Sequence, residues 1–470
     1  MTTTWTRSAP RRRRALLVAL LLVTTACAGA GGGASEDPLT ASTDEATADG
    51  ATAAAEGVTN VRMVLWPGPE GDAMQEVVDA YNAGQGQEDG IAVEMVLLSR
   101  DDTFARQATE IGSQSSNVDV YFVASYNVGF FAEGLSSLAD LPLDEADYFD
   151  VAVEGLQVDG ELYAVPLDVS NHFLYYRSDL IDQLLSDAAW QDTYRTISQE
   201  VLGEARDPRH PDEWEIDDYL AAAAFFSRSA NPDSPTEYGT ALQLKTSPFN
   251  ITLWDDLLWG LGGGWVDDSG AATLDSEEAI QVTDVYRTIY EQEYTSPDAS
   301  QAEYGETNAA LQSGDTAFAL QWSSATGELT DPEASPEIAD TIALAPVPGA
   351  PHRTHVHALA VSLNRHSENP EAATTWLSYL ATPEAMDAYA KAGGIPSMPQ
   401  VLEDNVDVNA AFPDITAHID EFGYSPPVFS GTFEAMTGLT EELSPAWLGL
   451  EEPAAAQASA QERLQTLLDG

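Results

Sequence analysis

The sequence predicts an α/β protein whose N-terminal part forms a parallel sheet. Three strongly apolar runs, residues 61–66, 91–98 and 119–124, carry this prediction. Between them lie two stretches with apolar residues on one helical face, so that strands and helices alternate along the chain. The third run is continuously apolar, as is typical of a strand that is buried on both faces. In such sheets ligands bind beyond the carboxyl ends of the strands.

Farther along the chain, residues typical of turns and helix caps predict a hairpin and the starts of two helices. Asp159 and Gly160 form a two-residue turn that predicts a β-hairpin. Residues 191–210 fit no clear element and are interpreted as a surface insertion. Pro370 and Pro383 each follow a residue that can cap a helix, which predicts a helix start at both positions.

The composition is that of a large acidic protein. Aspartate and glutamate total 77 against 19 lysines and arginines, and the formal net charge is −58. Nucleic acid and anionic lipid surfaces are therefore disfavoured as partners, because like charges repel. The chain is long enough, and at 44% hydrophobic residues apolar enough, for two or more packed domains. The single cysteine excludes an internal disulfide.

The N-terminus has the pattern of an export signal over residues 1–26. An arginine run precedes an apolar stretch that is shorter than the ~20 residues needed to span a bilayer. Cys27 follows directly, and residues 24–27 resemble the lipobox of a bacterial lipoprotein, in which Cys27 would carry the lipid. An ordinary cleaved signal is the alternative, and the choice between Sec and Tat export stays open. Residues 27–60 are small, polar and acidic, which predicts a disordered tether.

Several short motifs run in order from residue 61 toward the C-terminus. They are residues 64–66 before a glycine-containing loop, 117–120, 131–138, 162–166, 174–180, 211–215, 313–318 with Trp322, and 369–373. In this order they resemble the extracellular solute-binding protein family 1, the sugar-binding receptors of ABC importers typified by maltose-binding protein. His355, Val356 and His357 stand where that family usually has two glycines.

The resemblance implies two α/β lobes with a ligand cleft between them. Lobe one would comprise residues 61–168 and 358–401, and lobe two residues 169–357 and the C-terminal helices of 402–470. Strand crossings between the lobes would lie near residues 166–171, 357–363 and 398–403. Closure of the lobes would bury the ligand and create the surface that the permease subunits of the transporter recognise. Such a receptor is expected to be a monomer without cofactor.

Sugar sites combine aromatic platforms with fixed polar groups. The aromatic candidates are Trp66 at the end of the first strand, Trp265 after three glycines, and Trp322 at the position where the family stacks sugars. An ordinary core position is an alternative for Trp66 and Trp265. The polar candidates follow strand ends or lie at the first crossing, and they are Glu70, Tyr126, Asn127, Asp168, Ser170 and Asn171.

His352, His355 and His357 form a histidine cluster near the second crossing. His355 and His357 would share one face of a strand, a spacing that zinc can use. We favour a position in the cleft or at its rim, because no metal-site motif surrounds these residues. His357 therefore joins the ligand-binding candidates, and no metal site is expected.

The leading hypothesis is a lipid-anchored, non-enzymatic receptor that captures a carbohydrate, such as an oligosaccharide, for an ABC importer. One alternative keeps the fold and replaces the sugar with a cationic or amino-bearing solute. Another is a secreted glycoside hydrolase, since the abundant carboxylates could supply an acid and a base. No catalytic signature stands out in the sequence, and the sequence does not identify the sugar.

Overall fold

The computed structural model describes residues 57–470. The predicted export signal, Cys27 and nearly all of the predicted tether over residues 27–60 lie outside the described residues. Within the described part of the chain, no helix is long and apolar enough to cross a membrane.

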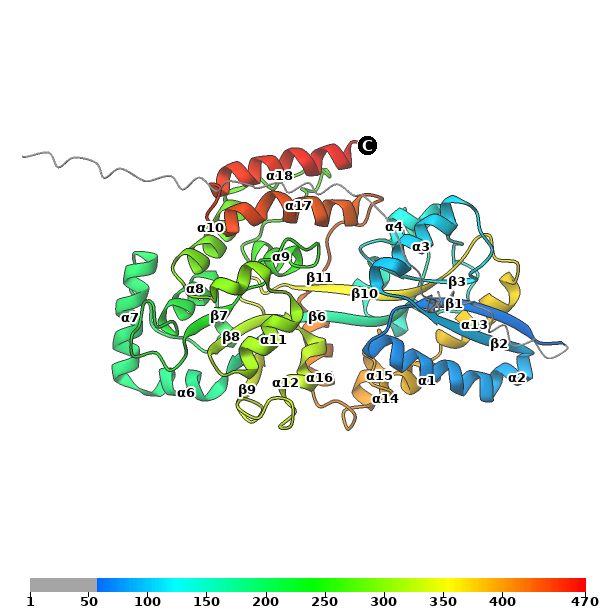
Figure 1. The fold of residues 1–470 in the computed structure, drawn as a ribbon, viewed down its shortest axis with the longest axis horizontal. Coiled ribbons are helices and arrows are strands. Elements are labelled where there is room, and N and C mark those ends of the chain that lie inside the picture. Colours follow the sequence, from blue (N-terminus) through cyan, green and yellow to red (C-terminus); the bar gives the residue numbers. More distant parts are fainter. Residues whose placement is uncertain (1–56) are drawn as a thin grey trace, which may run out of the picture. The chain divides into compact units, whose positions relative to one another are not determined.

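A nine-stranded mixed sheet runs through the described residues (Figure 1). Its strands, in spatial order, are β2 (Ile91–Leu97), β1 (Thr59–Leu65), β3 (Val120–Ala124), β10 (Thr354–Leu363), β6 (Val165–Arg177), β8 (Thr316–Trp322) and β7 (Tyr238–Ala241). Two short strands pair off this path, β9 (Ile342–Ala345) with β6 and β11 (Gly423–Tyr424) with β10. A separate hairpin consists of β4 (Gln157–Val158) and β5 (Glu161–Leu162).

The first three strands confirm the predicted parallel sheet. β1 pairs in parallel with β2 on one side and with β3 on the other. α1 (Pro69–Ala83) lies between β1 and β2 along the chain, and α3 (Arg100–Gly112) lies between β2 and β3. α1 begins with a proline in its first turn and buries Ala73, Met74 and Val77 on one face. The helical periodicity in the sequence therefore marks the face that covers the sheet.

Two long strands connect the two ends of the sheet. β6 pairs with β10 through its first half and with β8 and β9 through its second half. β10 in turn pairs with β3 through residues 359–363. Every residue of β10, and nearly every residue of β6, is buried. The crossings expected near residues 166–171 and 357–363 thus fall on these strands, while the predicted lobe boundaries stay predictions.

Helices cover both faces of the sheet and extend beyond it (Figure 1). They are α2 (Gln85–Asp89), α4 (Val128–Phe131), α5 (Asp150–Glu154), α6 (Ser178–Ser186), α7 (Ala188–Leu202), α8 (Ile216–Phe225), α9 (Ile251–Gly260), α10 (Glu277–Glu291), α11 (Tyr304–Gln312), α12 (Thr326–Leu329), α13 (Pro370–Leu380), α14 (Pro383–Lys391), α15 (Pro399–Asp404), α16 (Phe412–Phe422), α17 (Thr432–Trp447) and α18 (Pro453–Leu468).

The predictions made from turn and helix-cap residues are confirmed. Asp159 and Gly160 both have positive φ, 53° and 78°, as the predicted hairpin turn requires. α13 and α14 begin at Pro370 and Pro383, as expected. At the second of these starts, the Thr382 hydroxyl accepts a hydrogen bond from the backbone of the first turn.

One expectation is wrong. The third crossing was expected as a strand near residues 398–403, but Pro399–Asp404 forms helix α15, because proline fits the first turn of a helix and cannot donate to a strand ladder. The surface insertion predicted over residues 191–210 is partly helical: residues 191–202 belong to α7, which packs on α8 and buries Tyr194 and Ile197.

Candidate functional site

A pocket of about 410 Å³ lies where three strands of the sheet end. Trp66 and Glu70 follow β1, the segment from Gln243 to Asn250 follows β7, and Trp322 is the last residue of β8. The pocket therefore lies beyond the carboxyl ends of strands, as expected for a ligand site in an α/β sheet. Its volume is within the range of about 300–1,000 Å³ that small-molecule sites occupy.

The lining combines aromatic rings, carboxylates, amides and hydroxyls. The residues are Trp66, Pro67, Gly68, Pro69, Glu70, Ser170, Gln243, Ser247, Phe249, Asn250, Glu303, Tyr304, Trp322, Ser324 and His357. Five of them, Trp66, Glu70, Ser170, Trp322 and His357, are among the ten ligand-binding candidates from the sequence. The structure therefore brings half of the candidates together in one pocket.

The aromatic rings at the pocket are held by edge contacts with their neighbours. The Trp66 ring meets Phe122 at 4.4 Å between centroids and Phe104 at 5.6 Å, both edge to face. On the other side, the Trp322 ring lies 4.6 Å from His357 and 3.9 Å from His172. Each indole thus makes at least one edge-to-face contact with a neighbouring ring, an arrangement that aromatic pairs favour.

Tyr126 lies behind the pocket lining. Its ring contacts Phe249 at 5.6 Å and His357 at 5.7 Å, and Phe433 of α17 lies at a similar distance. It is buried and supports two residues that line the pocket. The structure thus places Tyr126 beside the pocket and not among its lining residues.

The two lining carboxylates have different surroundings. Glu303 forms an ion pair with Lys245 at 2.7 Å and also caps the N-terminus of α11. Glu70, in the first turn of α1, is half-buried. Its charge influences the pKa of residues on two other elements. Burial raises the pKa of Asp168 on β6 and of Tyr304 on α11, and the negative charge of Glu70 adds to both shifts. Glu70 lines the pocket together with Ser170 of β6 and Tyr304 of α11, where its carboxylate can accept a hydrogen bond from a ligand hydroxyl.

Asp168 is buried behind the pocket and is 2% exposed. One of its oxygens, Oδ2, accepts two hydrogen bonds, from the Tyr389 hydroxyl at 3.0 Å and from the Ile395 backbone N–H at 2.8 Å. Burial raises the pKa of this carboxyl well above its ordinary range, and nearby Glu70 raises it further. Asp168 thus joins β6 to the segment that follows α14.

Three other candidates also lie outside the pocket lining. The Asn127 side chain accepts a hydrogen bond from the backbone of Ala124 and closes the turn after β3. Asn171 is fully buried and donates to the carbonyl of its neighbour. Trp265 is 2% exposed in the core, and its indole N–H donates to Asp255 at 2.7 Å.

The three clustered histidines have different environments. His355 and His357 alternate with Val356 on β10, and their rings lie 5.9 Å apart, which confirms that they share a face. Only His357 lines the pocket. His352 hydrogen-bonds through Nδ1 to the carbonyl of Val347. No group of three or more histidine, cysteine, aspartate or glutamate side chains in residues 57–470 is arranged to hold a metal ion.

Several lining residues escaped the sequence reasoning, among them Gln243, Phe249, Asn250 and Tyr304. The first three follow β7, a strand of four residues that is too short to stand out in the sequence. Had β7 been recognised, the rule for carboxyl ends of strands would have pointed to this loop. Tyr304 is the first residue of α11 and has no comparable signal.

Comparison with known families gives one match across most of the chain. The model of a family described as bacterial extracellular solute-binding protein matches residues 76–414. A probable ABC transporter-binding protein of Deinococcus radiodurans is 26% identical over 308 residues, which cover 62% of this chain and 65% of that protein. The mannitol-binding protein of Pseudomonas aeruginosa is 26% identical over 263 residues, 55% of this chain and 54% of that protein. The chain thus matches about half to two thirds of the length of these relatives.

The fold also matches solved structures. The maltose-bound MalE3 of T. maritima superposes with a TM-score of 0.70 at 18% identity, over 87% of this chain and 99% of that one. At this level of identity the likeness establishes the fold alone, and it agrees with the α/β architecture expected from the sequence.

Proposed function

Because the chain belongs to the bacterial extracellular solute-binding protein family, we propose that its pocket captures a carbohydrate for an ABC importer. One observation carries the proposal: the pocket joins two indoles, Trp66 and Trp322, with the polar side chains of Glu70, Ser170 and Gln243. The apolar faces of a sugar ring stack on aromatic rings, and its hydroxyls need fixed donors and acceptors around them. This pocket supplies both kinds of contact.

The size of the pocket favours a short carbohydrate. At about 410 Å³ it is at the lower end of the range for small-molecule sites. Trp66 is 3% exposed and Trp322 is 8% exposed, so each indole presents only a small part of its surface to the pocket. We therefore extend the expectation of an oligosaccharide toward sugars of one or two rings and toward sugar alcohols.

The receptor acts by binding and release, without catalysis. In this proposal it is exported, is held at the cell surface by a lipid on Cys27, and delivers its ligand as a monomer to permease subunits. The tether over residues 27–60 provides the reach between the membrane and the folded body. A single acyl chain anchors weakly, so Cys27 would carry more than one, palmitate included.

Isothermal calorimetry with a ligand panel tests the binding proposal. Maltose, D-mannitol and maltotriose represent carbohydrates, and spermidine represents cationic solutes. We expect saturable binding of at least one carbohydrate, with the sugar recovered unchanged by chromatography. Binding of spermidine alone would favour the cationic alternative, and release of shorter sugars from maltotriose would indicate a hydrolase.

The anchor is tested separately, in cells that express the full chain. We expect the protein in the membrane fraction, with a lipid mass on the N-terminal peptide that begins at Cys27. Cys27→Ala should release the protein into the medium without changing ligand affinity. An unmodified wild-type N-terminus would contradict the anchor and leave the binding proposal intact.

A further inference from the structure

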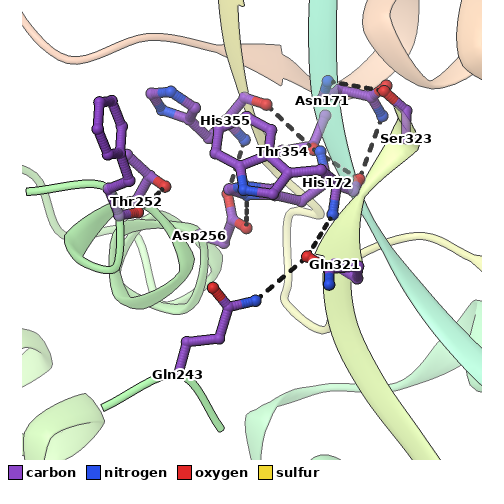
Figure 2. A network of polar contacts seen from close by, with 11 residues as sticks. Asn171, His172, Gln243, Thr252, Asp256, Gln321, Ser323, Thr354 and His355 are labelled. Carbon is purple, nitrogen blue, oxygen red and sulfur yellow. Dashed lines mark hydrogen bonds and ion pairs between the residues drawn. The ribbon is translucent and has the colours of Figure 1, made fainter. Parts of the chain in front are cut away.

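A buried polar cluster joins Asp256, His172, Thr354 and His355 (Figure 2). The Trp322 ring contacts both histidines of this cluster. The centre of the cluster is Asp256 of α9, which is fully buried. Oδ2 of Asp256 lies 2.7 Å from Nδ1 of His172 on β6, and Oδ1 accepts a hydrogen bond from the backbone N–H of His355 on β10 at 2.6 Å. One carboxyl group therefore joins a helix to both crossing strands.

The cluster reaches the pocket through His172. In the antiparallel pairing of β6 and β8, His172 is directly opposite Trp322. Their rings meet at 3.9 Å between centroids, the shortest ring contact of Trp322, and His355 adds an edge contact at 5.7 Å. Trp322 itself lines the pocket. Asp256 thus influences the indole from a distance, by fixing the imidazole against which the indole rests.

The same residues hold the crossing strands together. The Thr354 hydroxyl accepts a hydrogen bond from the backbone N–H of His172 at 2.9 Å and donates one to the carbonyl of His172 at 2.8 Å. The His355 ring is stacked between His172 at 5.6 Å and Trp259 at 6.0 Å. The cluster therefore joins the middle of β6 and the start of β10 to α9, next to Trp322.

Burial sets the protonation of the pair. It raises the pKa of the Asp256 carboxyl well above its ordinary range and lowers the pKa of His172 to about 3. Other titratable groups near the pair are His355, whose pKa is lowered by burial and then by His172, and Asp255 on the same helix. Burial therefore favours the uncharged form of each group, while Oδ2 of Asp256 and Nδ1 of His172 lie within hydrogen-bond distance.

Stability alone does not account for the cluster. Within residues 57–470, Nε2 of His172 and both ring nitrogens of His355 are buried without a hydrogen-bond partner. A buried polar atom that lacks a partner costs about 1–3 kcal/mol, whereas apolar side chains of similar shape would avoid this cost. The contacts that the imidazoles do make are with Asp256 and with the Trp322 ring, and these contacts bear on their role.

We propose that Asp256 and His172 are positioning residues of the ligand pocket, which fix the Trp322 indole as a stacking platform. The inference rests on the proposed role of Trp322 in carbohydrate binding. Neither Asp256 nor His172 lines the pocket, so both act through Trp322 and do not contact the ligand.

The test compares two neighbouring buried acids. Asp256→Ala removes the support of His172, whereas Asp255→Ala removes an equally buried carboxyl that accepts a hydrogen bond from Trp265 in the core. Asp256→Asn is the conservative rescue, because its amide N–H can donate to Nδ1 of His172 and its oxygen can accept from the His355 N–H. Each variant is made with Trp322 and with Trp322→Phe, so that the difference spectrum isolates the emission of Trp322.

In the ligand-free protein, Asp256→Ala should shift the Trp322 emission to the red and at least double its quenching by acrylamide. Asp256→Asn and Asp255→Ala should leave both unchanged. With maltose as the probe, Asp256→Ala should weaken binding at least tenfold, and Asp255→Ala less than threefold. Equal effects of the two alanine variants, or an unchanged Trp322 signal in Asp256→Ala, would overturn the proposal.

A replacement variant and the ligand-free measurement keep the test decisive. If circular dichroism shows that Asp256→Ala is unfolded, His172→Leu replaces it, because it removes the imidazole against Trp322 and retains an apolar side chain of similar size. If the wild type binds no carbohydrate, the proposed function fails, while the Trp322 emission still decides whether Asp256 positions the indole.

Discussion

Replacing Asp168 by asparagine should leave the protein equally stable or make it more stable at neutral pH. Both hydrogen bonds to this side chain end on the same oxygen, Oδ2, so the single oxygen of an asparagine can accept both. The substitution also removes a carboxyl whose ionisation is opposed by burial and by the charge of Glu70. The matched control is Asp168→Ala, which removes both acceptors.

The size of the alanine effect follows from the two donors that it leaves without a partner. The Tyr389 hydroxyl and the Ile395 N–H are both buried, and each unpaired donor costs about 1–3 kcal/mol, or about 2–6 kcal/mol together. At about 2.1 cal/mol/K of unfolding entropy per residue, each kcal/mol lowers Tm by about 1 °C in a cooperative unit of this length. Asp168→Ala should therefore lower Tm by about 2–6 °C.

The pH dependence of stability separates charge from hydrogen bonding. The pKa of Asp168 is raised in the folded protein, so the folded state retains a proton that the unfolded chain loses above a pH of about 4. Stability therefore falls as the pH rises from there through the folded pKa, because the folded state binds more protons. Asp168→Asn lacks this loss, and its Tm relative to wild type should increase with pH.

Differential scanning calorimetry between pH 4 and pH 8 measures these differences, with ligand affinity recorded alongside. Because Asp168 does not line the pocket, Asp168→Asn should change affinity less than threefold. The reasoning is refuted if the asparagine variant is as unstable as the alanine variant, or if its advantage over wild type shrinks as the pH rises. A large loss of affinity would instead return Asp168 to the ligand site.

Three further substitutions test the pocket, the backbone packing and a buried charge. Trp322→Ala should weaken carbohydrate binding by at least about 2 kcal/mol, roughly thirtyfold in Kd, and an unchanged titration would remove it from the site. Gly239→Ala should destabilise the fold by about 1–3 kcal/mol or more in urea unfolding, since its Cβ would collide with the backbone of Ala223. Arg209→Ala should lower Tm, because Arg209 pairs at 2.6 Å with the fully buried Asp218; an unchanged Tm would show that Arg206 compensates alone.

Strong local signals made much of the fold predictable from the sequence. β1, β2 and β3 are apolar runs separated by helices of clear periodicity, and Pro370 and Pro383 mark helix starts that hold in the structure. β7 was not predictable, because four residues carry little pattern and its place depends on pairing with β8.

Position after a recognised strand or in a family motif predicted part of the pocket lining, although Tyr126 and Asn127, which also follow a strand, lie outside it. Trp66 and Trp322 are at such positions, and both line the pocket. Asp168 and Trp265 do not line the pocket, because each is held elsewhere by a hydrogen bond. Asp168 accepts one from Tyr389, which is distant along the chain, and Trp265 donates one to Asp255 on another element. No local sequence pattern predicts such partners.

The order of strands in the sheet has a consequence for when this protein can fold. β3 ends at residue 124, and its second neighbour, β10, is synthesised only from residue 354 onward. Until then the edges of β3 and of the first half of β6 lack their shared partner, and pairings so distant along the chain form slowly. We therefore expect the central part of the sheet to form only after residues 354–363 are available, late in synthesis. If the chain is exported unfolded, its folding would begin only after most of it has crossed the membrane.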